Sequence, residues 1–269
     1  MTTLILHVQD DPAFESRLQA ALDLTRDAQA HLVCVQATPI ASYVASDPFG
    51  GVFVMGDIVA QLNERDAALR ARVEARLQGE NVTWNWVHMD GDPAAVLVEQ
   101  ARLADLILVS RTARPQTGTR QPLPLVEDVA LHARVPVLVI PPEAKGFDPS
   151  QIALIAWNGS PESAAALRAA CPMLKKSSGV HLAVIGEDDE FFPANDAALY
   201  LARHNIAATV HQRPAAEDVA QALVQAARDV NAGYLVMGAY GHSRLREFLV
   251  GGVTRGLLGQ SPLPLLIAH

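Results

Sequence analysis

The stretch LILHVQDDP at residues 4–12 has a counterpart with the same pattern of residue types at residues 152–161, which read IALIAWNGSP. Each is a short apolar run followed by a polar turn and a proline, and the two prolines, Pro12 and Pro161, stand 149 positions apart. An amphipathic stretch follows each, to about Ala28 and about Lys175. Short runs rich in Val, Ile and Leu are typical of buried parallel strands. Both stretches are therefore predicted to form a strand, a turn and a helix.

The similarity continues along the chain and indicates an internal repeat. Three further pairs of segments match: 98–102 with 224–228, 106–109 with 234–237, and 135–140 with 263–268. Each copy is predicted to run strand, helix, strand, helix, strand, helix, strand. We expect a first domain over residues 1–142 and a second over residues 150–269, joined by a short proline-containing linker.

Alternation of strands and helices predicts an α/β fold, with a doubly wound parallel sheet and right-handed crossovers. Such sheets bind ligands outside the carboxyl ends of their strands. The first copy also carries an additional segment, roughly residues 41–56, which contains Pro48 and the pair Gly50–Gly51. It is interpreted as a surface insertion near the binding edge, and a lid or a separate pocket stays open as an alternative.

Composition excludes several classes of protein. Half of the 269 residues are hydrophobic and the formal charge is −8, which excludes general disorder and argues against a duplex nucleic-acid partner. The two cysteines, Cys34 and Cys171, lie in apolar runs and are predicted to be buried and reduced. No apolar stretch reaches the length of a membrane helix, and the amino-terminal residues do not resemble a signal peptide. We expect a cytoplasmic protein with no membrane partner.

The stretch VMGAYGHSRLREFLVGGVT, residues 236–254, carries the clearest chemical signal. It begins at the end of a predicted strand, and its four glycines stand at junctions where backbone N–H groups are free to bind an anion. His242, Ser243 and Arg244 offer further donors. The stretch is neither a Walker loop nor a dinucleotide GxGxxG fingerprint. It favours phosphate binding, and the alternative is that these glycines only cap helices and form turns.

The spacing Gly238-x2-Gly241-x9-Gly251 resembles the ATP-binding signature of the universal stress protein family, and nearly the whole chain resembles a tandem member. The resemblance implies that each domain is an open five-stranded parallel sheet with helices on both faces. It also implies a stress-response function, with ATP bound across the carboxyl ends of the strands; Mg2+ with the ATP, or AMP or ADP in its place, stays open.

The resemblance places the nucleotide site in the second domain. The residues it implies there are Ala156, Trp157, Asn158, Val184, Met237, Gly238, Gly241, His242, Gly251, Gly252, Val253 and Thr254. Two of them depart from the family pattern, because Asn158 stands in place of Asp and Gly252 in place of Ser or Thr. In the first domain Ser110, Ala113, Leu123 and Pro124 replace the glycines, and we expect no family-type binding there.

Other chemistries have weaker support. The histidines show no metal-ligand spacing, and the GxSxG motif that holds the nucleophile of a serine hydrolase is absent from the sequence. Residues 188–190 are interpreted as a solvated acidic loop, and a Mg2+ ligand set is the less favoured alternative. We predict no catalytic residue, with at most slow ATP hydrolysis or autophosphorylation on Ser243 or Thr254. The favoured function is a nucleotide-binding regulator that acts through an unidentified protein partner, and a homodimer stays open. The alternative is a nucleotide-independent scaffold with both sites degenerate.

Overall fold

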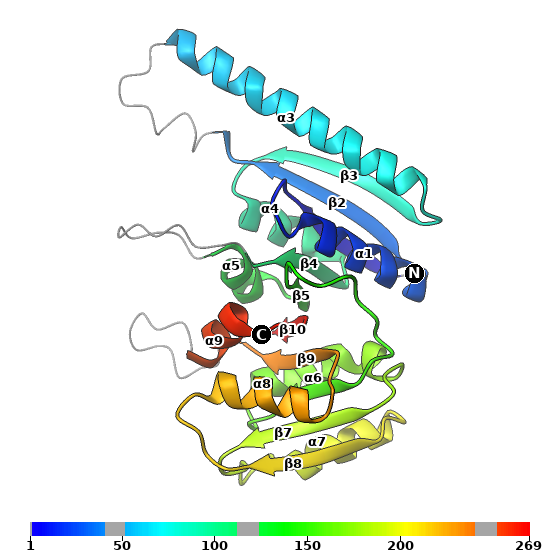
Figure 1. Cartoon of the computed structure of the whole chain (residues 1–269), viewed down its shortest axis with the longest axis vertical. Helices are drawn as coiled ribbons and strands as arrows, with labels where there is room; N and C mark the ends of the chain where they lie inside the picture. Colours follow the sequence, from blue (N-terminus) through cyan, green and yellow to red (C-terminus); the bar gives the residue numbers. More distant parts are fainter. Residues whose placement is uncertain (1, 41–51, 112–123, 240–251) are drawn as a thin grey trace.

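The described strands form one ten-stranded sheet, to which each repeat contributes five parallel strands (Figure 1). The computed structural model describes residues 2–40, 52–111, 124–239 and 252–269. The elements of the first repeat are β1 (Thr3–Val8), α1 (Phe14–Ala28), β2 (His31–Thr38), α3 (Val52–Gln78), β3 (Thr83–Asp90), α4 (Pro93–Gln100), a 3-10 turn (Ala101–Leu103), β4 (Leu106–Ser110), α5 (Leu125–His132) and β5 (Val137–Ile140). Those of the second are β6 (Ala153–Ala156), α6 (Pro161–Leu174), β7 (Val180–Ile185), α7 (Ala194–Arg203), β8 (Ala208–Arg213), α8 (Val219–Asp229), β9 (Tyr234–Gly238), α9 (Gly252–Gln260) and β10 (Leu265–Ala268).

The last strands of the two repeats join the sheets edge to edge. β5 pairs antiparallel with β10, with Leu138 opposite Leu266, and the described strands form one sheet in the order β3-β2-β1-β4-β5-β10-β9-β6-β7-β8. In Figure 1 the first repeat occupies the upper half and the second the lower half, and β5 and β10 meet between them. The predicted fold class is confirmed, and the two repeats pair through their last strands within one chain.

Helices cover both faces of this sheet because successive strand residues point to opposite sides. Along β9, Tyr234 and Val236 face one core, which α1, α3, α6 and α7 cover. Leu235 and Met237 face the other core, which α4, α5, α8 and α9 cover. Every strand of the inner part of the sheet is therefore buried on both sides, as its apolar run predicts.

Two elements differ from the sequence prediction. β8 was not predicted, because this edge strand has no continuous apolar run and only its alternate residues face the core. Helix α3 begins at Val52, so residues 52–56 of the predicted insertion are helical, while residues 41–51 lie outside the described part of the chain. Residues Leu69, Val73 and Leu77 of α3 are buried against the sheet, in agreement with their helical spacing.

The two cysteines, Cys34 and Cys171, are free and buried, as predicted. Burial, with the nearby charge of Glu74, raises the pKa of the Cys34 thiol to about 12. Within the described ranges, no helix combines the length and the hydropathy of a membrane span.

Polar contacts also hold the two repeats together, in addition to the pairing of β5 with β10. Arg111, directly after β4, donates from Nη1 to the carbonyl oxygens of Leu258 and Gly259 at 3.2 and 2.9 Å, which caps the carboxyl end of α9. Lys176, after α6, binds Asp27 of α1 at 2.7 Å. Each contact joins a residue of one repeat to a helix of the other.

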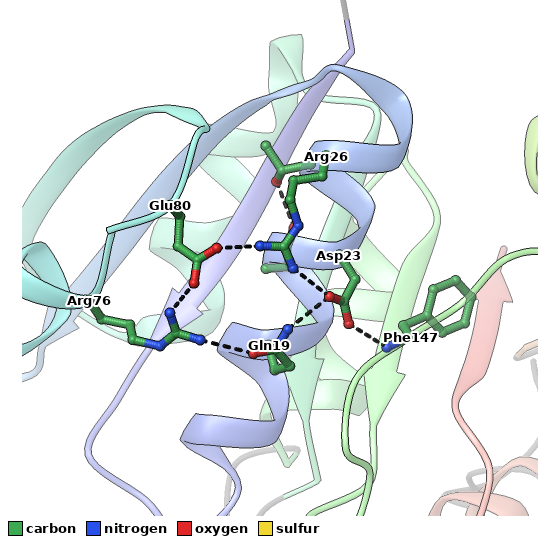
Figure 2. A network of polar contacts seen from close by, with 8 residues as sticks. Gln19, Asp23, Arg26, Arg76, Glu80 and Phe147 are labelled. Atoms are coloured by element: carbon green, nitrogen blue, oxygen red, sulfur yellow. Dashed lines mark hydrogen bonds and ion pairs between the residues drawn. The ribbon is translucent and has the colours of Figure 1, made fainter. Parts of the chain in front are cut away.

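Asp23 of α1 lies at the centre of the network in Figure 2. Its Oδ2 accepts from the N–H of Phe147 in the linker at 3.1 Å, and its Oδ1 accepts from Gln19 and Arg26 at 2.8 and 2.7 Å. Arg26 and Arg76 both contact Glu80, which follows α3. The network therefore connects α1, the end of α3 and the linker.

We predict that Asp23→Ala lowers the free energy of unfolding by about 2 kcal/mol, because it leaves a linker N–H and two side chains without their acceptor. Urea unfolding monitored by circular dichroism measures this change. Glu99→Ala is the control. Glu99 is 54% exposed and its ion pair with Arg102 is long, at 3.8 Å, so this substitution should change stability by less than about 0.5 kcal/mol. Equal effects of the two substitutions would contradict a structural role for the network.

Candidate functional site

A pocket of about 340 Å3 opens at the carboxyl ends of β6 and β7 in the second repeat. Trp157 and Asn158 line it from the end of β6, and Val184 and Ile185 line it from the end of β7. The rest of the lining is the loop that follows β7, residues 187–191. The pocket thus lies where a doubly wound sheet is expected to bind its ligand.

Hydrogen bonds fix the shape of the loop after β7. Asp188 accepts from the N–H of Ala194 at 3.1 and 2.9 Å and so caps α7, and Asp189 Oδ1 accepts from the N–H groups of Phe191 and Phe192 at 2.9 and 2.7 Å. The indole of Trp157 donates to the carbonyl oxygen of Phe192 at 3.0 Å. These two carboxylates support the loop backbone, which favours the acidic-loop interpretation over a Mg2+ ligand set. Among the described residues, no group of three or more side chains has a metal-binding arrangement.

Gly238 ends β9 directly against the first turn of α6. A Cβ at this position would lie 2.4 Å from the backbone carbon of Glu162 and 2.4 Å from the backbone nitrogen of Ser163. A valine here would therefore disturb the fold itself and not only a bound phosphate, because the glycine is required by the close approach of strand and helix.

The other predicted residues fall into three groups. Ala156 pairs with the buried Met237 at the ends of β6 and β9, next to Trp157. Gly252 begins α9 and is exposed, Val253 is half-buried, and Thr254 is buried, which leaves its hydroxyl inaccessible as a phosphate acceptor. Gly241, His242 and Gly251 lie outside the described residues, as do Ser243, Ala113 and Leu123.

Three of the predicted residues, Trp157, Asn158 and Val184, therefore line one pocket. Sequence reasoning missed its other walls: Ile185, Phe191 and the acidic residues were not predicted as ligand-binding. Their position directly after β7 was the available signal, because residues at the carboxyl end of a parallel strand face the binding edge.

The same place in the first repeat is filled by polar side chains. Strand pairing puts Gln36 of β2 where Val184 stands in β7. Its amide donates to Asp66 of α3 at 2.9 Å, and Thr38 donates to the same carboxylate at 2.6 Å. Gln36 and Thr38 are both buried, so α3 closes the region that forms the pocket in the second repeat.

At the end of β1 a buried guanidinium takes up further space. Arg17 donates to the carbonyl oxygen of His7 at 2.8 Å and pairs with Asp11 at 2.9 Å, and Arg17 and His7 are each 1% exposed. Burial, helped by the charge of Arg17, lowers the pKa of His7 to about 3. His7 is therefore neutral in the folded protein near pH 7.

A larger cavity, of about 810 Å3, lies elsewhere, between α1, the linker and the residues that precede β6, β9 and β10. Its charged lining is largely engaged: Asp23 and Arg26 belong to the network in Figure 2, and Asp27 binds Lys176. The cavity lies at the amino ends of β6, β9 and β10, away from the carboxyl edge where a doubly wound sheet binds its ligand. The smaller pocket at β6 and β7 is thus the better candidate.

Comparisons with known proteins agree with this architecture. A model of the universal stress protein family matches residues 3–141 and 150–269. A universal stress protein from Archaeoglobus fulgidus DSM 4304 is similar over 99% of this chain and 97% of its own, with 16% identity and a TM-score of 0.74. A functionally unknown protein from Pseudomonas aeruginosa PAO1 is similar over 99% and 92%, with 15% identity and a TM-score of 0.60. At such identities the structures show the fold alone, and no curated protein matches the chain.

We predict that Gly238→Ala destabilises the protein by about 3 kcal/mol or more, because the added methyl group has to displace the backbone of α6. Thermal unfolding of the ligand-free protein measures the effect. Gly252→Ala is the matched control, since a Cβ there meets no atom of the described residues within 4 Å and the unfolding temperature of this variant should be close to that of the wild type. Equal unfolding temperatures for both variants would refute the close approach at Gly238.

The low pKa of His7 predicts a pH-dependent loss of stability. Between about pH 6.5 and pH 3 the unfolded chain binds a proton at His7 that the folded protein does not, so stability falls as the pH falls through this range. At pH 5 the loss from this group is about 2 kcal/mol relative to pH 7.5. Urea unfolding of the wild type and of His7→Leu at both pH values isolates it. The same pH dependence in both proteins would show that His7 is not responsible.

Proposed function

Because the chain belongs to the universal stress protein family, we propose that its second repeat binds an adenine nucleotide, ATP or a related compound, and that its first repeat does not. The base lies in the pocket at β6 and β7, and the phosphates lie at the glycine-rich stretch between β9 and α9. The bound nucleotide stabilises or switches the fold, and the output is an interaction with a partner protein rather than turnover.

The observation that carries this proposal is the pocket that contains Trp157, Asn158 and Val184. Its volume is at the lower end of the range for small-molecule sites, and its apolar walls suit a flat base. Met237 lies two strands from Val184, since β9 pairs with β6 and β6 with β7. The sheet thereby brings segments distant in sequence to one edge.

Side-chain hydrogen bonds at the corresponding place in the first repeat support an asymmetric molecule. Gln36 and Asp66 are hydrogen-bonded to each other where the second repeat is open. Pro124 has no N–H and lies at the amino terminus of α5, whereas Gly252 begins α9. At this described position the first repeat therefore offers no backbone donor for a phosphate, whereas Gly252 has one.

A regulatory role requires only that the bound nucleotide shifts a conformational equilibrium. A ligand at 100 times its dissociation constant stabilises the folded state by about 2.7 kcal/mol, enough to shift a marginal conformational equilibrium. A partner protein that binds one of the two conformations more tightly then responds to the nucleotide concentration.

We predict that Gly252→Ser strengthens ATP binding about fivefold. The serine adds a hydroxyl donor at the first residue of α9, where the family carries Ser or Thr, and its Cβ meets none of the described residues within 4 Å. A gain of roughly 1 kcal/mol is typical of one hydrogen bond. Isothermal titration calorimetry with ATP, with and without Mg2+, measures affinity and stoichiometry.

Gly252→Ala is the control, because it adds the carbon without the hydroxyl and should bind as the wild type does. The expected stoichiometry is one nucleotide per chain. A stoichiometry of two would place a second site in the first repeat. No binding of ATP, ADP or AMP at millimolar concentration would overturn the proposal and favour the nucleotide-independent scaffold.

A further inference from the structure

Two histidines from neighbouring strands meet on one face of the sheet in the second repeat. Nδ1 of His181, in β7, lies 2.8 Å from Nε2 of His211, in β8, and the ring centroids are 5.0 Å apart. The strand register accounts for this contact, because His211 pairs with Ala183 and so lies on the same face as His181, one diagonal step along the sheet. The two strands lie side by side at one end of the sheet (Figure 1).

The short distance between the two ring nitrogens has two chemical readings. Two neutral imidazoles either share one hydrogen in an N–H···N bond or direct two lone pairs at one metal ion. With Zn–N bonds of 2.0–2.1 Å, two nitrogens of a tetrahedral zinc site lie about 3.3 Å apart. The rings of His181 and His211 therefore need to separate by only about half an ångström to hold an ion between them.

The surroundings favour the neutral rings that a metal ion requires. Both histidines are half-buried, and among the described residues neither ring has another hydrogen-bond partner. Burial, followed by the neighbouring His211, lowers the pKa of His181. Arg213 is the next residue of β8 on the same face, and its charge is paired with Asp229 at 2.8 Å. Metal binding thus has neither a ring proton nor an unpaired positive charge to overcome near pH 7.

We propose that His181 and His211 form a two-histidine site for a divalent transition-metal ion, Zn2+ or Cu2+, with water completing the coordination. Imidazole nitrogen suits both ions, and Cu2+ is the tighter of the two for a given set of ligands. Within the described ranges no third metal-binding side chain joins the pair, so the site is weaker than a four-ligand structural zinc site.

This site goes beyond the proposed nucleotide function and does not depend on it. The residues of β7 that line the pocket are Val184 and Ile185, at the carboxyl end of the strand, whereas His181 is the second residue of β7. A bound ion would connect the edge strand β8 to its neighbour through side chains as well as through the backbone. Because the ion binds the folded protein, it raises the unfolding temperature.

The test is calorimetric titration of the metal-free chain with Zn2+ at pH 7.5, in a buffer that does not bind metals. The wild type is compared with His181→Gln and His211→Gln, and thermal unfolding without metal checks that each variant folds. His132→Gln is the control. Its side chain is 62% exposed on α5 of the first repeat and lies beside a carboxylate, Asp128, so the control removes a histidine that also has a potential ligand next to it.

We expect His181→Gln and His211→Gln each to weaken the tightest Zn2+ site at least about tenfold, because one imidazole remains, and the control to bind as the wild type does. Zn2+ should raise the unfolding temperature of the wild type and the control more than that of the two variants. With Cu2+, electron paramagnetic resonance should show two coordinated imidazole nitrogens in the wild type and one in each variant.

Two results would overturn the metal site. One is a Zn2+ affinity within twofold of the wild type in both variants, which would place the bound ion elsewhere. The other is no binding of Zn2+ or Cu2+ by the wild type at millimolar concentration, which would leave the pair as an N–H···N hydrogen bond. Neither result bears on nucleotide binding, because the titration contains no nucleotide.

Discussion

The antiparallel pairing of β5 with β10 is the interaction on which the arrangement of the molecule depends. Each repeat ends in a short, fully apolar strand that would be an exposed edge if the repeat stood alone. Exposed strand edges of this kind readily pair with other chains, and the pairing of β5 with β10 covers both edges. Arg111 and Lys176 add contacts between the repeats on either side of this pairing. One continuous sheet results, with helices on both faces and the polar edge strands β3 and β8 at its ends.

Within this sheet the two repeats have diverged at the carboxyl ends of corresponding strands. In the second repeat, short α7 and a hydrogen-bonded loop leave a pocket above β6 and β7. In the first, the longer helix α3 places Asp66 over the corresponding strands, where it binds Gln36 and Thr38. A buried Arg17 then fixes the loop after β1. The same fold therefore supports an open site in one half and a closed, hydrogen-bonded core in the other, which fits the proposal of one ligand per chain.

The fold could be predicted from the sequence because its information is local and repeated. Apolar runs such as residues 4–8 and 152–157 indicate buried strands, and the spacing of Leu69, Val73 and Leu77 indicates a helix. β8 lacked such a run, since an edge strand is buried on one face only. The packing constraint on Gly238 could not be predicted, because it comes from the backbone of α6, distant in sequence, and no local pattern records that contact.

The pocket could be predicted only in part for a similar reason. Trp157, Asn158 and Val184 came from a family resemblance, and they do line one cavity. The acidic loop that forms the rest of the wall was interpreted only as a solvated loop, because the sequence does not show that residues 187–191 border the same pocket as Trp157. Likewise, the closing of the first repeat depends on Asp66, in a helix that starts within a segment interpreted as an insertion.

The central claim is that the adenine ligand occupies the second repeat at the ends of β6 and β7. Photolabelling with 8-azidoadenosine, followed by digestion and mass spectrometry, tests it most directly because it identifies the residues next to the base. The account predicts a single labelled region within residues 157–191, with labelling suppressed by unlabelled adenosine. Adenosine-protected labelling of residues 5–38 in the first repeat, or of the linker cavity, would contradict it.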